Sequence, residues 1–296
     1  MINELSLFSG YGGFTLGLRL AGLNVRTVAY VEWDKYPQEI IKARIGDGYL
    51  DDAPIFSDIS SFRGEQFRGV VDIITAGFPC QPHSVAGLQR GATDTRNLWP
   101  DTLRVIREVE PRWVILENVP GLLSAPVDGG RPAYGGTVVG ELAQVGYSVH
   151  WQTIGADDVG APHRRKRWWC IGVADSIYDG LYRARGVATE SGSYEPHHRL
   201  SERGDCATGE RGLGDIPIWP PSPGDTDAWE RVIRERPDLA PALSKEAESQ
   251  FRRMDNGSSD RLDRPSANDR VNRLKALGNG IVPQSLAEFL RRVTNV

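Results

Sequence analysis

The chain of 296 residues has few cysteines, no long apolar run and no strong excess of charge of one sign. Its three cysteines, Cys80, Cys170 and Cys206, lie far apart and form no CxxC or Cys/His spacing, which argues against disulfides or structural zinc. No apolar run approaches the length of a membrane span, and the first residues have no basic-then-apolar signal pattern. We therefore expect a cytoplasmic protein without metal and without a membrane partner.

The charge pattern excludes a uniformly basic nucleic-acid coat, because the net charge is −4. One concentrated basic patch stands out, Arg164-Arg165-Lys166-Arg167. Arginine dominates the basic residues, and it suits planar, bidentate contacts with phosphate and guanine. A GC-rich genome would produce the same arginine bias, so composition alone leaves both explanations open.

Strand-like and helix-like segments alternate over the first 175 residues. Short strands are expected at Leu5–Phe8, Val25–Val31, Pro54–Phe56, Val70–Ala76, Trp113–Leu116, Ser148–Thr153 and Trp168–Val173. Apolar residues at helical spacing fall between them, at Thr15–Ala21, Lys35–Ala43, Leu98–Val109 and Val138–Val145. This rhythm predicts an α/β fold with a doubly wound, mostly parallel, Rossmann-like sheet.

A change of composition at about residue 175 predicts a second, smaller domain. Residues 175–270 are rich in Gly, Ser, Pro, Arg and acidic residues and have few apolar repeats. They form either a disordered insertion or a loop-rich lobe, and Trp219 and Trp229 favour some packing. Order is expected to return from residue 271, with a closing helix at Gln284–Val293. The sequence thus predicts one domain made of residues 1–174 and 271–296, interrupted by residues 175–270.

The stretch Ala76-Gly77-Phe78-Pro79-Cys80-Gln81-Pro82 follows the apolar run Val70–Thr75. Gly77 and Pro79 end the strand abruptly, so Cys80 is expected in a turn at the edge of the sheet, where open α/β sheets bind ligands. This position makes Cys80 the candidate nucleophile. The alternative is an inert, buried thiol, because lone cysteines are usually small core residues.

Three features along the first strands suggest an adenosine site. Phe8-Ser9-Gly10-Tyr11-Gly12-Gly13-Phe14 is a glycine-rich turn that lets the backbone approach a ligand. Glu32 follows the second strand, where a carboxylate can accept from ribose hydroxyls, and Trp33 offers a face to a purine. Asp58, after the third strand, could accept from an adenine amino group. The alternatives are a core aromatic for Trp33 and a helix cap for Asp58.

An acidic residue ends the fifth predicted strand, in Ile115-Leu116-Glu117-Asn118-Val119-Pro120-Gly121. Glu117 would lie in the same row as Cys80, and partial burial would raise its pKa toward neutrality. Its alternative role is to cap nearby backbone amides. A thiol and a carboxyl at adjacent strand ends form a nucleophile and acid pair that requires no histidine base.

Motif for motif, and in the same order, the chain resembles the cytosine-C5 DNA methyltransferases. The matching motifs are Phe8–Phe14, Glu32-Trp33, the catalytic loop Gly77–Gln81, the acidic Glu117–Val119 and the C-terminal Gly278-Asn279. The resemblance covers about residues 1–174 and 271–296, and residues 175–270 stand where the family has its variable target-recognition domain. The Pro-Cys-Gln and Glu-Asn-Val pair is the most specific part of this match.

The resemblance implies a reaction on a cytosine flipped out of duplex DNA. The Cys80 thiolate would add to C6, Glu117 would bind N3 and the amino group, and C5 would take a methyl group from S-adenosylmethionine. The family's Gln-x-Arg-x-Arg motif is matched by His163-Arg164-Arg165-Lys166-Arg167, with Arg167 suited to contact the base and Glu117. His163 replaces the usual glutamine, which leaves the role of this position open. The alternative for the whole motif is a solvated basic face.

The resemblance implies three sets of site residues. The catalytic set is Cys80, Glu117, Arg165 and Arg167. The cofactor-binding set is Phe8, Gly10, Gly12, Gly13, Glu32, Trp33, Asp58, Ile59, Pro79, Leu98 and Asn279. The nucleic-acid-binding set is Gln81, Ser84, Arg90, Arg96 and Asn118, of which Ser84, Arg90 and Arg96 belong to what would be a mobile catalytic loop.

The expected partner is double-stranded DNA, read sequence-specifically in restriction–modification or phage protection, by a monomer. A cognate restriction endonuclease that acts independently is a candidate companion. Three other functions compete with this hypothesis: a tRNA cytosine-C5 methyltransferase, a non-catalytic DNA-binding regulatory module, and a nicotinamide dehydrogenase suggested by the glycine-rich turn alone. The intact Cys80 and Glu117 argue against the second of these.

Overall fold

The computed structural model describes residues 1–79, 97–125, 133–161, 163–177 and 279–294, together with positions 227, 230, 231, 234 and 272. The predicted catalytic loop from Cys80 to residue 96 and nearly all of residues 175–270 lie outside this part. Residues 1–159, 163–177 and 279–294 belong to one compact unit. The domain boundaries predicted from composition remain a prediction.

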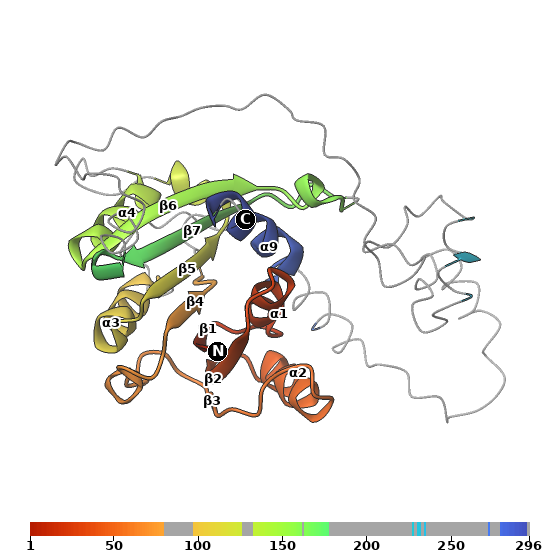
Figure 1. Cartoon of the computed structure of the whole chain (residues 1–296), viewed down its shortest axis with the longest axis horizontal. Helices are drawn as coiled ribbons and strands as arrows, with labels where there is room; N and C mark the ends of the chain where they lie inside the picture. Colours follow the sequence, from red (N-terminus) through yellow and green to blue (C-terminus); the bar gives the residue numbers. More distant parts are fainter. Residues whose placement is uncertain are drawn as a thin grey trace. The chain divides into compact units, whose positions relative to one another are not determined.

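Seven strands form a single sheet in the order β3-β2-β1-β4-β5-β7-β6 (Figure 1). They are β1 (Ile2–Leu7), β2 (Val25–Val31), β3 (Ile55–Phe56), β4 (Ile73–Ala76), β5 (Trp113–Asn118), β6 (Tyr147–Ile154) and β7 (Arg167–Ala174). Strands β1 to β5 pair in parallel, and β7 runs antiparallel to both of its neighbours. The predicted doubly wound, mostly parallel α/β fold is confirmed.

Helices cover both faces of the sheet. They are α1 (Gly13–Leu20), α2 (Lys35–Gly46), α3 (Trp99–Val109), α4 (Tyr134–Gln144) and α9 (Pro283–Thr294), and short 3₁₀ turns occur at Glu65–Phe67, Pro120–Leu123 and Asp157–Val159. Figure 1 shows α1, α2 and α9 on one face and α3 and α4 on the other. We call these the α1 face and the α3 face. Among the described residues, no helix is both long and apolar enough to cross a bilayer.

Each face has its own apolar core. On the α3 face, Val105, Ile106 and Val138 pack on β1, β4 and β5, and on the α1 face Phe14, Leu18 and Phe289 pack on Trp169. Burying one such side chain stabilises the fold by about 1.5–3 kcal/mol. Because helices cover both faces of the sheet, its parallel strands are buried on both sides, and their sequences are therefore continuous apolar runs.

The C-terminal helix α9 lies against α1 at close range. A Cβ at Gly17 would stand 2.9 Å from the Pro283 carbonyl oxygen and 2.8 Å from Leu286, so only glycine permits this approach. Gly17 therefore anchors the C-terminal segment to the helix that follows the glycine-rich turn.

All the predicted strands and helices of the described part are present, with shifted ends. One such shift is in β4, which is predicted from Val70 but begins at Ile73. The amides of Val70 and Val71 both donate to the Phe67 carbonyl, which commits them to a turn, and the Val70 side chain is half-exposed. Apolar character alone had extended the predicted strand into that turn.

Candidate active site

The strand order reverses between β1 and β4, which makes their carboxyl ends the switch point of the sheet. Ligands of doubly wound folds bind in the crevice outside such a point. The glycine-rich turn leaves β1 here, and the segment Gly77-Phe78-Pro79 leaves β4. The two motifs predicted to serve cofactor and chemistry therefore start from neighbouring strands.

The glycine-rich turn has a strained backbone, with positive φ at Phe8 (52°), Gly10 (56°) and Gly12 (83°). A non-glycine residue rarely adopts such a φ, so Phe8 marks a locally forced conformation of the kind that clusters at functional sites. A Cβ at Gly10 would meet nothing within 4 Å, so open space lies beside this backbone. The turn ends at Gly13, where α1 begins.

Glu32 fastens this turn to the end of β2. Its Oε2 accepts from the Gly10 amide at 2.8 Å, and its Oε1 accepts from the Asp34 amide at 2.8 Å. The adjacent Trp33 side chain is 73% exposed, which excludes its alternative role as a core aromatic.

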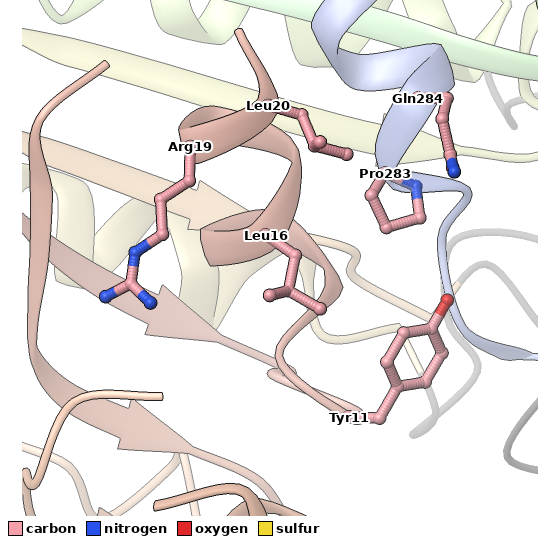
Figure 2. Close-up of a pocket in the computed structure, with 6 residues that line it drawn as sticks. All are labelled: Tyr11, Leu16, Arg19, Leu20, Pro283 and Gln284. Carbon is pink, nitrogen blue, oxygen red and sulfur yellow. The ribbon is translucent and has the colours of Figure 1, made fainter. Parts of the chain in front are cut away.

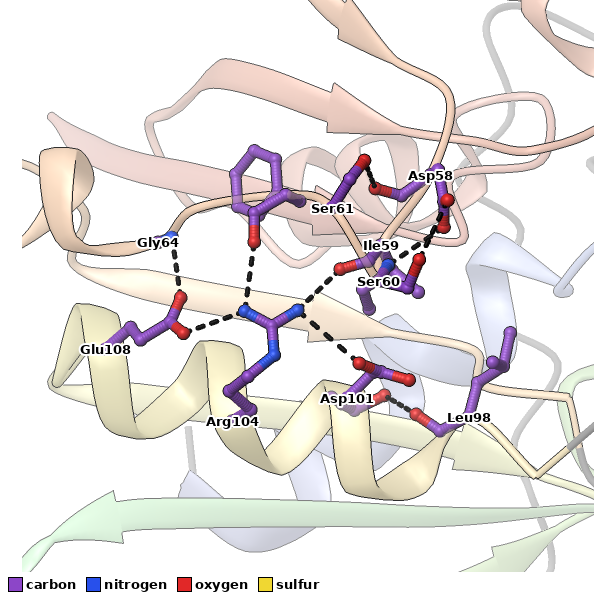
Figure 3. A network of polar contacts seen from close by, with 11 residues as sticks. Asp58, Ile59, Ser60, Ser61, Gly64, Leu98, Asp101, Arg104 and Glu108 are labelled. Carbon is purple, nitrogen blue, oxygen red and sulfur yellow. Dashed lines mark hydrogen bonds and ion pairs between the residues drawn. The ribbon is translucent and has the colours of Figure 1, made fainter. Parts of the chain in front are cut away.

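The loop after β3 is held down by α3. Arg104 donates to the carbonyl oxygens of Ile59 (2.6 Å) and Phe62 (2.9 Å) and pairs with Glu108 at 2.7 Å. Glu108 in turn accepts from the Gly64 amide (Figure 3). Sequence reasoning missed Arg104, because a surface arginine on a helix carries no signal of the loop it will contact.

Asp58 caps its own loop in the structure. Its carboxylate accepts from the Ser60 amide at 2.9 Å and from the Ser60 hydroxyl at 2.8 Å (Figure 3). No helix begins directly after Asp58, so it is not the helix cap considered as its alternative role, and its contact with an adenine amino group stays a prediction. Ile59 is buried, Leu98 precedes α3 and accepts from the Thr102 hydroxyl, and Asn279 is exposed.

Glu117 and Arg167 form the central pair of the site. Arg167 Nε lies 2.8 Å from Glu117 Oε1, and both side chains are largely buried. Burial raises the pKa of Glu117 to about 7, against the opposing effect of the Arg167 and Arg165 guanidinium groups. A carboxyl with this pKa can hold or donate a proton near neutral pH.

The segment leading to Cys80 passes beside this pair. In the parallel pairing of β4 with β5, Ala76 lies opposite Leu116, so Gly77 follows next to Glu117. A Cβ at Gly77 would stand 3.6 Å from Glu117 Oε2. Cys80 itself, with Gln81, Ser84, Arg90 and Arg96, lies outside the described residues, so their roles stay predictions.

The Asn118 side chain makes its contacts inside the protein, and its predicted contact with nucleic acid stays a prediction. Its side chain is 3% exposed, its amide nitrogen donates to the Phe78 carbonyl at 2.9 Å, and its oxygen accepts from the Val119 amide. The two strands leave the sheet side by side, so Asn118 can clamp the backbone just before Pro79. Its polar groups are used inside the protein, and we assign it to positioning.

Arg165 points to the C-terminal segment. It donates to the Gly280 carbonyl, and the Tyr11 hydroxyl donates to the neighbouring Ile281 carbonyl. Burial and the nearby charge of Arg167 lower the pKa of Arg165. The structure thus links Arg165, the glycine-rich turn and the segment before α9, a connection that sequence reasoning missed because it joins residues more than a hundred positions apart.

A mostly apolar pocket of about 440 Å³ lies between α1 and the start of α9 (Figure 2). Its lining residues are Tyr11, Leu16, Arg19, Leu20, Pro283 and Gln284. It includes none of the predicted catalytic residues. Cys170, the free cysteine of the described part, is fully buried in β7, and burial raises the pKa of its thiol, so it is no competing nucleophile.

Comparison with known proteins gives the family. The model of the C-5 cytosine-specific DNA methylase family matches residues 2–202. The chain belongs to this family. The match includes the glycine-rich turn, the segment that leaves β4 and the Glu117–Arg167 pair.

Curated relatives of the chain are type II methyltransferases. M.NgoBI of Neisseria gonorrhoeae is 34% identical over 178 residues, which cover 60% of this chain and 52% of the relative. M.HhaI of Haemophilus parahaemolyticus is 35% identical over 168 residues, 56% of this chain and 47% of the relative. The chain spans about half the length of the curated relatives it matches.

Among solved structures, the Dnmt2 methyltransferase of S. pombe matches with a TM-score of 0.56 at 18% identity, with full coverage of both chains. At this identity the likeness concerns the fold alone. Within the described residues, no group of three or more His, Cys, Asp or Glu side chains is placed to hold a metal ion.

Proposed function

We propose that the chain is a DNA cytosine-C5 methyltransferase that uses Cys80 as nucleophile and S-adenosylmethionine as methyl donor. The observation that carries this proposal is the buried Glu117–Arg167 pair beside the segment that leads to Cys80. A carboxyl with a pKa of about 7 is suited to hydrogen-bond N3 of a cytosine whose ring gains electrons. Family membership supports the same chemistry.

The residues at the switch point fit S-adenosylmethionine. Gly10 has open space beside it, the Glu32 carboxylate lies at the end of β2 next to the Gly10 amide, and the indole of Trp33 is exposed there for an adenine ring. When bound, this cofactor supplies a methyl group activated by a sulfonium centre for transfer to C5. Phe8 to Gly13, Glu32 and Trp33 would hold it.

The remaining steps belong to the chain's own residues. The Cys80 thiolate adds to C6 of the flipped cytosine, and protonated Glu117 donates to N3, which offsets the charge that the addition places on the ring. Arg167 holds the Glu117 carboxyl in place. After C5 is methylated, loss of its proton returns the electron pair to the ring and expels the Cys80 thiolate.

The pKa of Glu117 predicts an alkaline decline in kcat/KM. Because burial raises that pKa to about 7, Glu117 is fully protonated at low pH. It loses the proton that it donates as the pH rises through about 7. Replacing Arg167 with Gln removes a charge that lowers the Glu117 pKa, so the decline is expected to move to higher pH. The pH dependence of kcat/KM for both proteins checks this, and a decline at unchanged pH in the variant would contradict it.

Bisulfite sequencing of DNA from cells expressing the chain tests the proposed function. We expect methylated cytosines within one short recognition sequence, as a restriction–modification role requires, and none with the Cys80→Ala variant. Methylated tRNA with unmodified DNA would overturn the DNA proposal in favour of the RNA substrate. Unmodified DNA and RNA together with tight DNA binding would favour a non-catalytic module.

A further inference from the structure

Glu4 is a carboxylate in the middle of the apolar sheet. It lies in β1, the central strand of the switch point, and is 0% exposed. Its neighbours on the α1 face include Phe14, Leu18 and Ile73. Removing an ionisable group from water costs several kcal/mol, so a carboxylate here weakens the fold unless its partners compensate.

Three threonine hydroxyls from three elements surround the Glu4 carboxylate. Oε2 accepts from Thr15 of α1 and Thr27 of β2, and Oε1 accepts from Thr75 of β4, each at 2.7 Å. The Thr15 and Thr27 hydroxyls also lie 2.9 Å apart. Burial raises the pKa of Glu4, and the hydrogen bonds from the three threonines oppose that rise. One side chain therefore joins the helix and both strands that surround the candidate cofactor site.

The β1–β2 register shifts immediately after Glu4. Glu4 pairs with Thr27, but Leu5 pairs with Ala29, so Val28 is an extra residue in β2. As a result Val28 and Ala29 both pack on the α3 face, and Tyr30 returns to the α1 face. Without this bulge the alternation of side chains would be reversed from Ala29 onward.

The bulge decides where Glu32 meets the glycine-rich turn. Continuing the alternation past Val31 puts Glu32 on the α1 face, where its carboxylate accepts from the Gly10 amide. In the unbulged register Glu32 would point to the α3 face. The Glu4–Thr27 hydrogen bond lies at the last pair before the shift, where it can hold the bulged register.

We propose that Glu4 is a positioning residue of the cofactor site, which fixes the bulged register of β2 through Thr27 and the first turn of α1 through Thr15. This inference rests on the proposed function, because the site it positions is that for S-adenosylmethionine. It assigns Glu4 no contact with cofactor or substrate. Its effect is expected in cofactor affinity more than in the rate at saturation.

The test compares Glu4→Leu and Thr27→Val with the wild-type chain of 296 residues. Calorimetry is expected to show a Kd for S-adenosylmethionine raised about tenfold in Glu4→Leu and several-fold in Thr27→Val, with kcat at saturating cofactor within about threefold of wild type. Glu4→Gln, whose amide oxygen still accepts, is expected to restore most of the affinity. Thr27→Val removes the hydroxyl and keeps the shape of the side chain. If Glu4→Leu fails to fold, the Kd of Thr27→Val alone tests the inference.

Leu142→Ala on α4 is the control, because it lowers stability from the α3 face. Even if Leu142→Ala lowers the melting temperature as much as Glu4→Leu does, its Kd for S-adenosylmethionine is expected to stay within about twofold of wild type. An unchanged Kd in Thr27→Val, or an equal rise in Leu142→Ala, would overturn the inference.

A second readout needs no cofactor. The Gly10 amide, bonded to Glu32, is expected to be protected from hydrogen exchange in the wild type and to lose that protection in Glu4→Leu. If the wild-type chain bound no S-adenosylmethionine, the proposed function would fail, and the exchange of this amide alone would decide the claim about Glu4. Unchanged Gly10 protection in both Glu4→Leu and Thr27→Val would contradict that claim.

Discussion

Replacing Cys80 with alanine is expected to lower methyl transfer to cytosine by at least about 10⁴-fold in kcat. Without a thiolate adding to C6, the ring cannot become nucleophilic at C5, and neither Glu117 nor Arg167 can supply that bond. A factor of this size corresponds to about 5.4 kcal/mol of lost transition-state stabilisation. Single-turnover transfer of labelled methyl groups to DNA measures it.

Cys170→Ala is the matched control for the Cys80 variant. Its thiol is fully buried in β7, where Cys170 pairs with Leu116 of β5 and packs into the core of the α3 face, and burial raises the pKa of that thiol. Its removal is expected to leave kcat within about twofold of wild type, with a small loss of stability. If Cys170→Ala were inactive and Cys80→Ala active, the assignment of the nucleophile would be wrong.

Replacing Glu117 with glutamine is expected to lower kcat by about 10²–10³-fold, the usual cost of losing one aimed donor at a developing charge. The amide preserves the shape but holds no titratable proton, and it leaves the Arg167 guanidinium without its carboxylate partner. The alkaline decline in activity near pH 7 should disappear with it. Rapid-quench kinetics with saturating cofactor measures the rate.

Glu288→Gln is the control for loss of a paired carboxylate. Glu288 lies on α9 and pairs with Arg291 at 2.8 Å and Arg292 at 2.7 Å. Its removal is expected to change kcat by less than about twofold, because both partners lie on the same helix and pairs with solvent-accessible arginines contribute little. A Glu117→Gln variant as active as this control would exclude Glu117 from the chemistry.

The fold could be predicted from the sequence because its signals are local. The apolar runs that form β2, β5 and β7 are bounded by glycine, proline or charged residues, and a buried parallel strand needs little more. The order of the motifs placed Glu117 and the segment before Cys80 on neighbouring strand ends, and the pairing of β4 with β5 agrees. The ends of strands were less predictable, as the turn at Val70 shows.

The contacts that connect the site could not be predicted, because they depend on packing between distant elements. Glu4 precedes the predicted strand, so nothing in the pattern marked it as buried, and the β2 bulge leaves no trace in a run as uniformly apolar as Val28 to Val31. The bond from Asn118 to the Phe78 carbonyl requires knowing that β4 and β5 are neighbours. A motif can identify a functional residue, but the residues that it contacts depend on the tertiary structure.

Covalent trapping tests the central claim most directly. Duplex DNA carrying 5-fluorocytosine at its target cytosines has no C5 proton to lose after methylation, so the Cys80–C6 bond cannot break. With S-adenosylmethionine present, we predict a protein–DNA adduct that survives denaturing electrophoresis and maps to Cys80 by mass spectrometry. Its absence from DNA that the wild-type chain methylates, or its persistence in Cys80→Ala, would contradict the account.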